Sequence, residues 1–250
     1  MPILSYQLYS SRKFPPLEKT LTMLKGLGYE HVEGFGGLYE DPAALGAKLS
    51  AAGLTMPTGH FGLDMLENDS DKAIAVAKAT GMQAIYCPHI APDQRPSDAA
   101  GWRAFGARLQ EAGAPYRAAG FRFGWHNHDF EFKAQADGSI PMEEILAGGP
   151  ELAWEADIAW ITRGGGDPFD WIARHGNRIE AAHVKDIAPQ GECADEDGWA
   201  DVGHGVMDWA GLLVALKSSN ASVLVMEHDN PNDDERFASR SIAAVKALQE

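Results

Sequence analysis

The feature of this sequence that most limits its fold is a pattern repeated eight times, a short apolar run followed by a helical segment. The clearest run lies in Phe121–Phe132, FRFGWHNHDFEF. Read as a strand with a period of two, it directs its first aromatic residues to one face and His126 and His128 to the other. The predicted strands begin near residues 3, 31, 54, 84, 121, 152, 179 and 222.

The helical segments between these runs carry their own start and stop signals. In Asp41–Ala52, an aspartate cap and a proline at the first helical position mark the beginning of a helix. Ser97–Ala119 is predicted as one long helix, and the Asp-Gly pair within Phe130–Ile140 predicts a small hairpin. A strand and helix alternating over 250 residues predict a (β/α)8 barrel, with residues 1–250 as one domain. A doubly wound sheet is the alternative, but no glycine fingerprint follows an early strand.

Composition limits the partners that this chain can have. The formal net charge is −15, which opposes nucleic acid or an anionic membrane as partner and favours a small molecule. Only Cys87 and Cys193 are present, so we expect a reducing compartment. The first residues lack a basic start with a long apolar segment, and no run approaches the ~20 apolar residues of a membrane span. We therefore predict a soluble, cytoplasmic protein.

Almost every predicted strand finishes on a polar residue. Active sites of (β/α)8 barrels gather at the C-terminal ends of the strands, so these side chains are expected to share one site. A single polar strand end is usually just the start of a solvated loop, whereas agreement among eight ends favours a site. The residues are Gln7, Glu33, His60, His89, His126 with His128, Asp157, His183 with Lys185, and Glu227.

Three of these strand ends form a candidate metal site. Asp157, His183 and Glu227 come from consecutive predicted strands and converge in a barrel. Mixed carboxylate and imidazole ligands suit divalent Mn, Mg, Co or Zn. A fourth ligand should come from the preceding strand, where His126, His128 and Glu131 compete. Strand parity favours one of the histidines, and Glu131 reaches inward only if the loop bends back.

The sequence resembles the sugar phosphate isomerase/epimerase-like family, which has a xylose isomerase-like TIM barrel and is related to AP endonuclease family 2. The resemblance covers nearly the whole chain, and its motifs are more specific for the family than for a substrate. They are HNHDFEF at 126–132, the Glu155/Asp157 strand, HVKD at 183–186, VGHGVMDW at 202–209 and MEHD at 226–229.

This resemblance implies a metal site of a particular kind. Members of the family typically bind one divalent metal, often manganese, through two Glu, one Asp and one His at successive strand ends. Carried over to this chain, the ligands are Glu131, Asp157, His183 and Glu227, with His126 as the substitute for Glu131. We therefore expect manganese as the cofactor, with Mg, Co or Zn as alternatives.

The family's chemistry implies roles for the residues around the metal. A bound metal polarises a hydroxyl and an adjacent carbonyl of a sugar, which acidifies the neighbouring C–H bond. We expect Glu131 and Glu227 to move the proton through an enediolate and Lys185 to stabilise the developing oxyanion. The predicted substrate-binding residues are Glu33, His60, His89, His126, His128 and Glu155.

Several of these residues have a second interpretation. Lys185 could form a structural ion pair with Glu155 on the neighbouring strand. Arg163 with Gly164–Gly166 could form an anion nest, which leaves open whether the substrate is phosphorylated. Where many relatives have Glu in a GEG turn, this chain has His204, which would alter contacts of the loop.

The leading hypothesis is therefore a metal-dependent sugar isomerase or epimerase that acts on a keto-sugar or a sugar phosphate. The same site would also serve a lyase or dehydratase that acts by elimination on an inosose or a 3-keto-glycoside. An abasic-site endonuclease would need a basic groove, which the charge opposes. A non-catalytic sugar-binding barrel is the alternative from another class. A homo-oligomer is compatible with the sequence.

Overall fold

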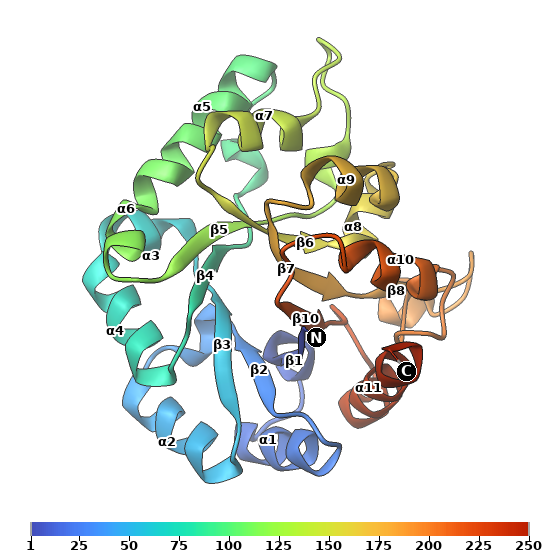
Figure 1. Ribbon diagram of the computed structural model, residues 1–250. Helices are drawn as coiled ribbons and strands as arrows, with labels where there is room; N and C mark the ends of the chain where they lie inside the picture. Colours follow the sequence, from blue (N-terminus) through green and yellow to red (C-terminus); the bar gives the residue numbers. More distant parts are fainter. Residues whose placement is uncertain (1, 250) are drawn as a thin grey trace.

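Eight parallel strands close into a barrel in the computed structural model, which describes residues 2–249 (Figure 1). Neighbours around the barrel follow the order β1-β10-β7-β6-β5-β4-β3-β2, and a two-stranded pair, β8 and β9, lies outside it. This architecture confirms the predicted (β/α)8 fold. The strands are β1 (Ile3–Gln7), β2 (His31–Gly34), β3 (Thr55–His60), β4 (Ala84–Cys87), β5 (Arg122–His126), β6 (Ala153–Asp157), β7 (Ile179–Val184), β8 (Asp186–Ile187), β9 (Trp199–Ala200) and β10 (Val223–Met226).

Helices surround the barrel on its outside (Figure 1). The predicted signals at Asp41 are used, since its side chain accepts a hydrogen bond from the Ala44 amide at 2.9 Å and Gly53 ends the helix with φ 66°. The α-helices are α1 (Leu17–Gly26), α2 (Pro42–Ala52), α3 (Leu63–Asn68), α4 (Ser70–Thr80), α5 (Ala99–Ala112), α6 (Ala114–Ala118), α7 (Pro141–Gly148), α8 (Ile158–Arg163), α9 (Pro168–His175), α10 (Trp209–Leu216) and α11 (Asp234–Gln249).

The segment predicted as one helix over Ser97–Ala119 is in fact two helices, α5 and α6. The break falls at Gly113, just before Pro115. Proline has no N–H with which to bond the carbonyl of Glu111 one turn earlier, so the longer helix cannot continue through it. The single-helix prediction was wrong because it gave the amphipathic pattern more weight than this proline.

The hairpin predicted over Phe130–Ile140 is also absent as a pair of strands. Its first residues form a 3-10 turn, η4 (Phe130–Phe132). A tight turn does follow, in which the Gln135 amide donates to the Ser139 carbonyl at 2.8 Å and Gly138 has φ 82°. The Asp-Gly signal therefore marks a turn, but no strand ladder extends from it.

Strand β3 is continuous although it contains Pro57. The register between β2 and β3 shifts at this point, from His31 opposite Thr55 to Glu33 opposite Thr58. The missing amide of the proline therefore falls where the ladder is already irregular, which is a position that tolerates proline in a sheet.

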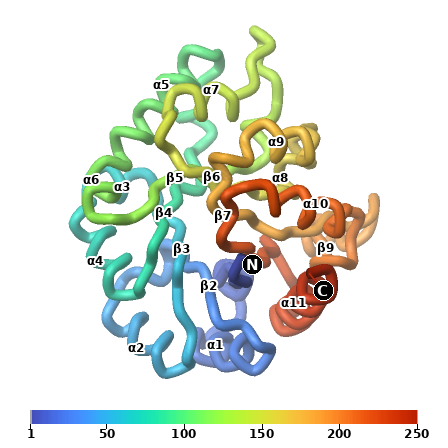
Figure 2. Tube along the Cα trace, in the orientation of Figure 1, coloured from blue at the N-terminus to red at the C-terminus, as the bar shows by residue number. Residues whose placement is uncertain are grey.

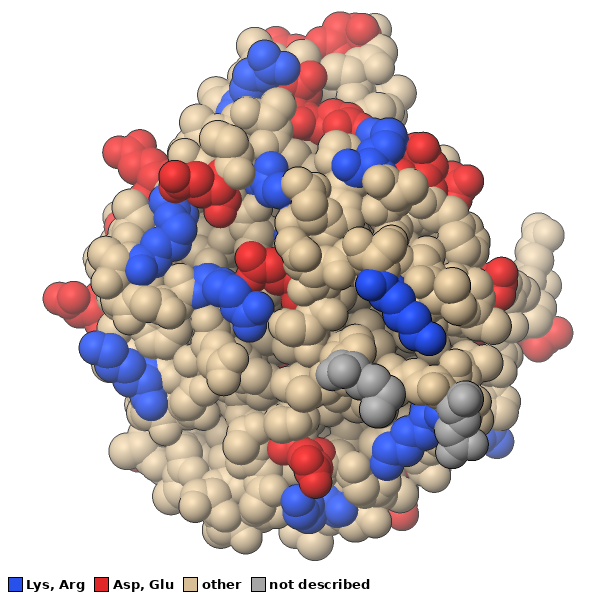
Figure 3. Space-filling view, viewed as in Figure 1, with Lys and Arg blue, Asp and Glu red and all other residues tan. Residues whose placement is uncertain are grey.

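Aromatic side chains fill the layer between the barrel and its helices. Trp125 on β5 packs edge-to-face against Phe105 on α5, with ring centroids 5.2 Å apart. The first and last α-helices, α1 and α11, are in contact with each other outside the barrel (Figure 2). In the view of Figure 3, acidic and basic side chains are interspersed over the surface. Within residues 2–249, none of the helices has the length and apolar character needed to cross a membrane.

Candidate metal centre

The ends of the barrel strands surround a cavity of about 490 Å³. Four histidines predicted from strand ends line it, together with aromatic rings and two aspartates from the loops. The lining residues are Tyr9, Arg12, Phe35, Gly36, His60, Gly62, Pro88, His89, His126, His128, Trp160, Asp197, Glu227 and Asp229. The sequence analysis did not single out Tyr9, Arg12, Asp197 or Asp229.

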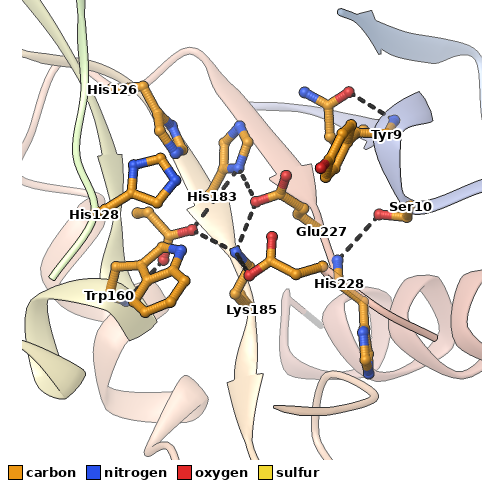
Figure 4. A network of polar contacts seen from close by, with 12 residues as sticks. Tyr9, Ser10, His126, His128, Trp160, His183, Lys185, Glu227 and His228 are labelled. Atoms are coloured by element: carbon orange, nitrogen blue, oxygen red, sulfur yellow. Dashed lines mark hydrogen bonds and ion pairs between the residues drawn. The ribbon is translucent and has the colours of Figure 1, made fainter. Parts of the chain in front are cut away.

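Four buried side chains lie together at the edge of this cavity, and two of them, His126 and Glu227, line it. They are His126, Asp157, His183 and Glu227, here called the ion group. One ligand atom from each lies within 4.8 Å of those of the others. His183 Nδ1 is 2.8 Å from Glu227 Oε2 and 4.0 Å from Asp157 Oδ2 (Figure 4). The three ligands predicted from consecutive strands are thus brought together, and His126 completes the set.

Local structure fixes the direction of the Asp157 carboxylate. This residue ends β6 and caps α8, where its Oδ1 accepts a hydrogen bond from the Trp160 amide at 2.9 Å. Asn127 holds the strand end, since its Oδ1 accepts from the Asp157 amide at 3.0 Å and its Nδ2 donates to the Asp157 carbonyl at 3.1 Å. Asp157 Oδ2 is buried and accepts no well-aligned hydrogen bond in the described chain, and Lys185 Nζ lies 3.1 Å from it as an ion-pair partner. The aligned hydrogen bond to Oδ1 leaves Oδ2 turned towards the other members of the ion group.

Glu131 lies outside the ion group. Its Oε1 accepts a hydrogen bond from Trp125 Nε1 at 2.9 Å, and its Oε2 accepts one from the His128 amide at 2.9 Å. The carboxyl is fully buried, and burial raises its pKa to about 8. Because the η4 turn carries Glu131 to the aromatic layer around Trp125, the structure places His126 where the resemblance predicted Glu131.

Lys185 adds a positive charge to one side of the ion group. Its Nζ lies 2.9 Å from Glu227 Oε2, 3.0 Å from Asp229 Oδ2 and 3.1 Å from Asp157 Oδ2, and the side chain is fully buried (Figure 4). Burial by itself lowers the pKa of Lys185, but the three carboxylates outweigh it and hold the pKa above its usual value. Lys185 therefore pairs with these carboxylates and not with Glu155, the partner considered from the sequence.

A second set of contacts lies next to the ion group and is formed by Glu33, His60 and Glu155, here called the inner group. Glu33 Oε1 is 2.7 Å from His183 Nε2, and Glu155 Oε2 is 3.2 Å from His126 Nδ1. His60 lies between the two acids, with its Nε2 2.5 Å from Glu155 Oε2 and 3.3 Å from Glu33 Oε1. Burial and the charge of Glu155 raise the pKa of Glu33. These residues were predicted to bind substrate, yet they contact the metal-site histidines.

The other predicted histidines lie on the cavity wall. The ring centroids of His89 and His128 are 5.7 Å apart, and His89 Nε2 lies 3.1 Å from a guanidinium nitrogen of Arg95. Burial, reinforced by Arg95, lowers the pKa of His89. His128 is also close to Trp160, with ring centroids 5.4 Å apart. Both imidazoles line the cavity, and the ring of His128 lies next to the ion group, with its centroid 5.3 Å from that of His126.

The segment considered as an anion nest does not form one. The amides of Gly164, Gly165 and Gly166 all donate to carbonyls of α8, at 2.9, 3.0 and 2.9 Å. The guanidinium of Arg163 lies 3.1 Å from the centroid of the Trp199 ring and donates to the Asp197 carbonyl at 2.9 Å. These amides close a helix C-terminus, whose dipole repels anions.

One carboxylate, that of Asp186, anchors the long loop that follows β8. It accepts hydrogen bonds from four backbone amides, at Ile187 (2.9 Å), Gly203 (2.9 Å), Gly205 (3.2 Å) and Met207 (3.1 Å). A Cβ atom on Gly205 would lie 2.2 Å from Asp186 Oδ1, so this position requires glycine. The loop is thereby held beside Lys185.

Two residues of this loop have clear surroundings. Trp199 is buried, and its ring centroid lies 4.7 Å from Lys185 Nζ. His204, which stands where many relatives were expected to have Glu, is exposed. The loop therefore covers Lys185 through Trp199, whereas His204 faces solvent.

Barrel and ion group together define a TIM-barrel protein with a candidate metal centre at the C-terminal ends of its strands. The family model for the xylose isomerase-like TIM barrel matches residues 21–248, and the chain belongs to this family. A search of curated proteins finds no match.

Solved structures share this fold at low sequence identity. A sugar phosphate isomerase/epimerase from Parabacteroides distasonis has a TM-score of 0.82 and 19% identity, covering 98% of this chain and 94% of that one. A probable 3-DHS dehydratase, AsbF, from Bacillus anthracis has a TM-score of 0.76 and 14% identity, covering 98% of each chain. The IOLI protein, with a bound zinc atom, has a TM-score of 0.76 and 15% identity, covering 99% and 98%.

Proposed function

We propose that this protein is a divalent-metal-dependent isomerase or epimerase that acts on a keto-sugar. The observation that carries the proposal is the ion group, in which two imidazoles and two carboxylates converge next to a cavity that His126 and Glu227 line. This donor set suits zinc, cobalt or manganese better than magnesium or calcium, which prefer oxygen ligands. The manganese expected from the resemblance is one of three candidates.

The chain's own groups account for proton movement at this site. When bound, a divalent ion polarises the carbonyl and hydroxyl oxygens of a sugar and so acidifies the adjacent C–H bond. Glu227, a member of the ion group, and Asp229, bonded to the same lysine, both line the cavity; one of them takes the proton, and the same group or the other returns a proton to carbon. Lys185, bonded to both, balances the negative charge that develops on the substrate. The proposal gives the proton-transfer role expected for Glu131 to these carboxylates, because the Glu131 carboxyl is bonded to Trp125 and to the His128 amide.

The charges around the cavity favour an unphosphorylated substrate. Asp197, Glu227 and Asp229 line it, and Arg12 is the single Lys or Arg among its described lining residues. Arg12 already donates to the Tyr9 carbonyl at 2.9 Å and stacks on the Tyr9 ring. The amides of the glycines after α8 are also bonded. A phosphate would therefore find few donors, whereas the aromatic and histidine walls suit a neutral sugar.

An elimination reaction on the same kind of substrate is the second candidate. Its support is the pair formed by His89 and His128, which lies on the cavity wall and whose neutral rings offer N–H groups that could donate a hydrogen bond to a departing oxygen. Isomerisation conserves the mass of the substrate, and elimination releases water or an aglycone. Product mass therefore separates the two reactions.

The proposal is tested by counting metal and by following proton exchange. We expect about one divalent ion per chain by mass spectrometry, and incorporation of deuterium from deuterated water into keto-sugars by the loaded protein. Asp157→Asn should lose most of the ion. Asp167→Asn is the matched control, because Asp167 caps α9 as Asp157 caps α8 but lies outside the ion group.

A protein that holds no ion and takes none up would refute the proposal and favour a non-catalytic sugar-binding barrel. The carbohydrate partner, a homo-oligomeric state and a cytoplasmic location stay predictions from the sequence.

A further inference from the structure

We infer that Glu33 and Glu155 are positioning residues, each fixing which nitrogen of a neighbouring histidine faces the metal ion. The inference rests on the proposed function, since it assigns roles around the ion group. Its basis is that one ring nitrogen of each histidine contacts a buried carboxylate outside the ion group, Glu33 for His183 and Glu155 for His126, so the other nitrogen is the one assigned to the ion.

The contacts of His183 define its orientation. Its Nε2 lies 2.7 Å from Glu33 Oε1, and that oxygen also accepts a hydrogen bond from Gln7 Nε2 at 2.7 Å. A carboxylate accepts only, so Nε2 carries a proton that it donates to Glu33. The Nδ1 of His183 lies 2.8 Å from Glu227 Oε2 and donates to it in the metal-free chain; a cation bound between Nδ1 and Glu227 would replace the Nδ1 proton and leave the Nε2 proton with Glu33.

His126 contacts its carboxylate through the other ring nitrogen, Nδ1. Its Nδ1 lies 3.2 Å from Glu155 Oε2, so the proton of the neutral ring sits on Nδ1 and the lone pair on Nε2. The same carboxylate oxygen is 2.5 Å from His60 Nε2, which keeps Glu155 in place. Metal-binding histidines commonly donate their second N–H to a carboxylate in this way, which fixes the tautomer and increases ligand basicity.

A second set of four residues could hold an ion in place of the ion group. Ligand atoms of His60, His126, Glu155 and His183 also lie within 4.8 Å of one another. Both sets share His126 and His183. Filling both would require each shared imidazole to bind an ion through each of its two nitrogens, and so to lose its remaining proton. A neutral imidazole has one lone pair on its nitrogens, so the two sets support one ion and not two.

The tautomers can be observed directly in the wild-type protein. In the zinc-loaded chain labelled with ¹⁵N-histidine, NMR should show His183 bound through Nδ1 with a proton on Nε2, and His126 bound through Nε2 with a proton on Nδ1. The reverse assignment for either ring would overturn the inference. Because this experiment uses no substitution, it does not depend on a variant folding.

Zinc affinity provides the second readout. Glu33→Leu should weaken zinc binding about 10–100-fold in a competition titration, the usual effect of losing such a carboxylate. Glu33→Gln, which keeps an acceptor oxygen, should recover most of the affinity. Thr58→Val is the matched control, because Thr58 faces Glu33 across the β2 and β3 ladder and its buried hydroxyl has no partner in the described chain.

The outcomes separate the inference from the proposed function. Unchanged zinc affinity in Glu33→Leu, or two ions per wild-type chain, would overturn the inference while leaving a metal-dependent function intact. A wild-type chain that binds no ion would overturn both. If Glu33→Leu fails to fold, the NMR assignment of the wild-type chain decides.

Discussion

The substitution Glu131→Gln should change the free energy of unfolding in opposite directions at pH 5 and pH 8. The carboxyl of Glu131 is fully buried and accepts hydrogen bonds from Trp125 Nε1 and from the His128 amide. Burial raises its pKa from the ordinary 4.5 to about 8. Gln has nearly the same shape and cannot titrate, so the comparison isolates the proton on this one group.

The sign follows from which state holds the proton. Below pH 4.5 the folded and the unfolded chain both hold it, and the carboxyl imposes no penalty. As the pH rises towards 8, the unfolded chain releases the proton while the folded chain keeps it, so folding stability falls. The loss reaches at most about 5 kcal/mol above pH 8. Gln avoids this loss, but it has only one acceptor oxygen, so one of the two N–H groups of Trp125 and His128 is left without a partner. The unpaired N–H group costs about 1–3 kcal/mol at every pH.

We therefore expect Glu131→Gln to be less stable than the wild type at pH 5 and more stable at pH 8. Urea unfolding of the metal-free proteins at pH 5, 6.5 and 8 measures the difference. Glu111→Gln, on the exposed surface of α5, serves as the control. A stability difference that does not vary with pH would refute the reasoning. Metal content adds a second readout, because Glu131→Gln should retain its ion if His126 and not Glu131 is the fourth ligand.

Three further predictions concern the site and its loop. Chelation should abolish turnover and, for an ion present at 100 times its Kd, remove about 2.7 kcal/mol of stability, which lowers the Tm by about 5–10 °C. Lys185→Met leaves three carboxylates without their cation and should destabilise the metal-free protein by about 3–5 kcal/mol in urea unfolding; no measurable loss would contradict the buried ion pairs. Gly205→Ala should cost about 1–3 kcal/mol and make residues 187–207 more sensitive to protease, because its Cβ meets Asp186.

The barrel could be predicted from the sequence because each strand leaves a local pattern. Phe121–Phe132 alternates between its two faces, and the structure indeed places His126 inside the barrel and Trp125 in the outer layer. Asp157, His183 and Glu227 meet because parallel strands deliver their C-terminal ends to one place.

Contacts between distant segments could not be predicted in the same way. Glu33 reaches His183 across the barrel interior, and no local pattern links two residues 150 positions apart. The place of Glu131 depends on the η4 turn, which directs it to Trp125 and away from the cavity. Asp229 ends the MEHD run and could have been recognised from it. Tyr9 and Arg12 follow β1 without any signal of their own.

The four hydrogen bonds that backbone amides donate to Asp186 have a consequence for how this protein can evolve. An acid at position 186 and glycine at position 205 form one unit, since the carboxylate occupies the space that a side chain at 205 would need. In a lineage that loses the acid at position 186, a residue larger than glycine should be tolerated at position 205 as well. The two positions should therefore change together among homologues, and the loop should diverge in length only after both have changed.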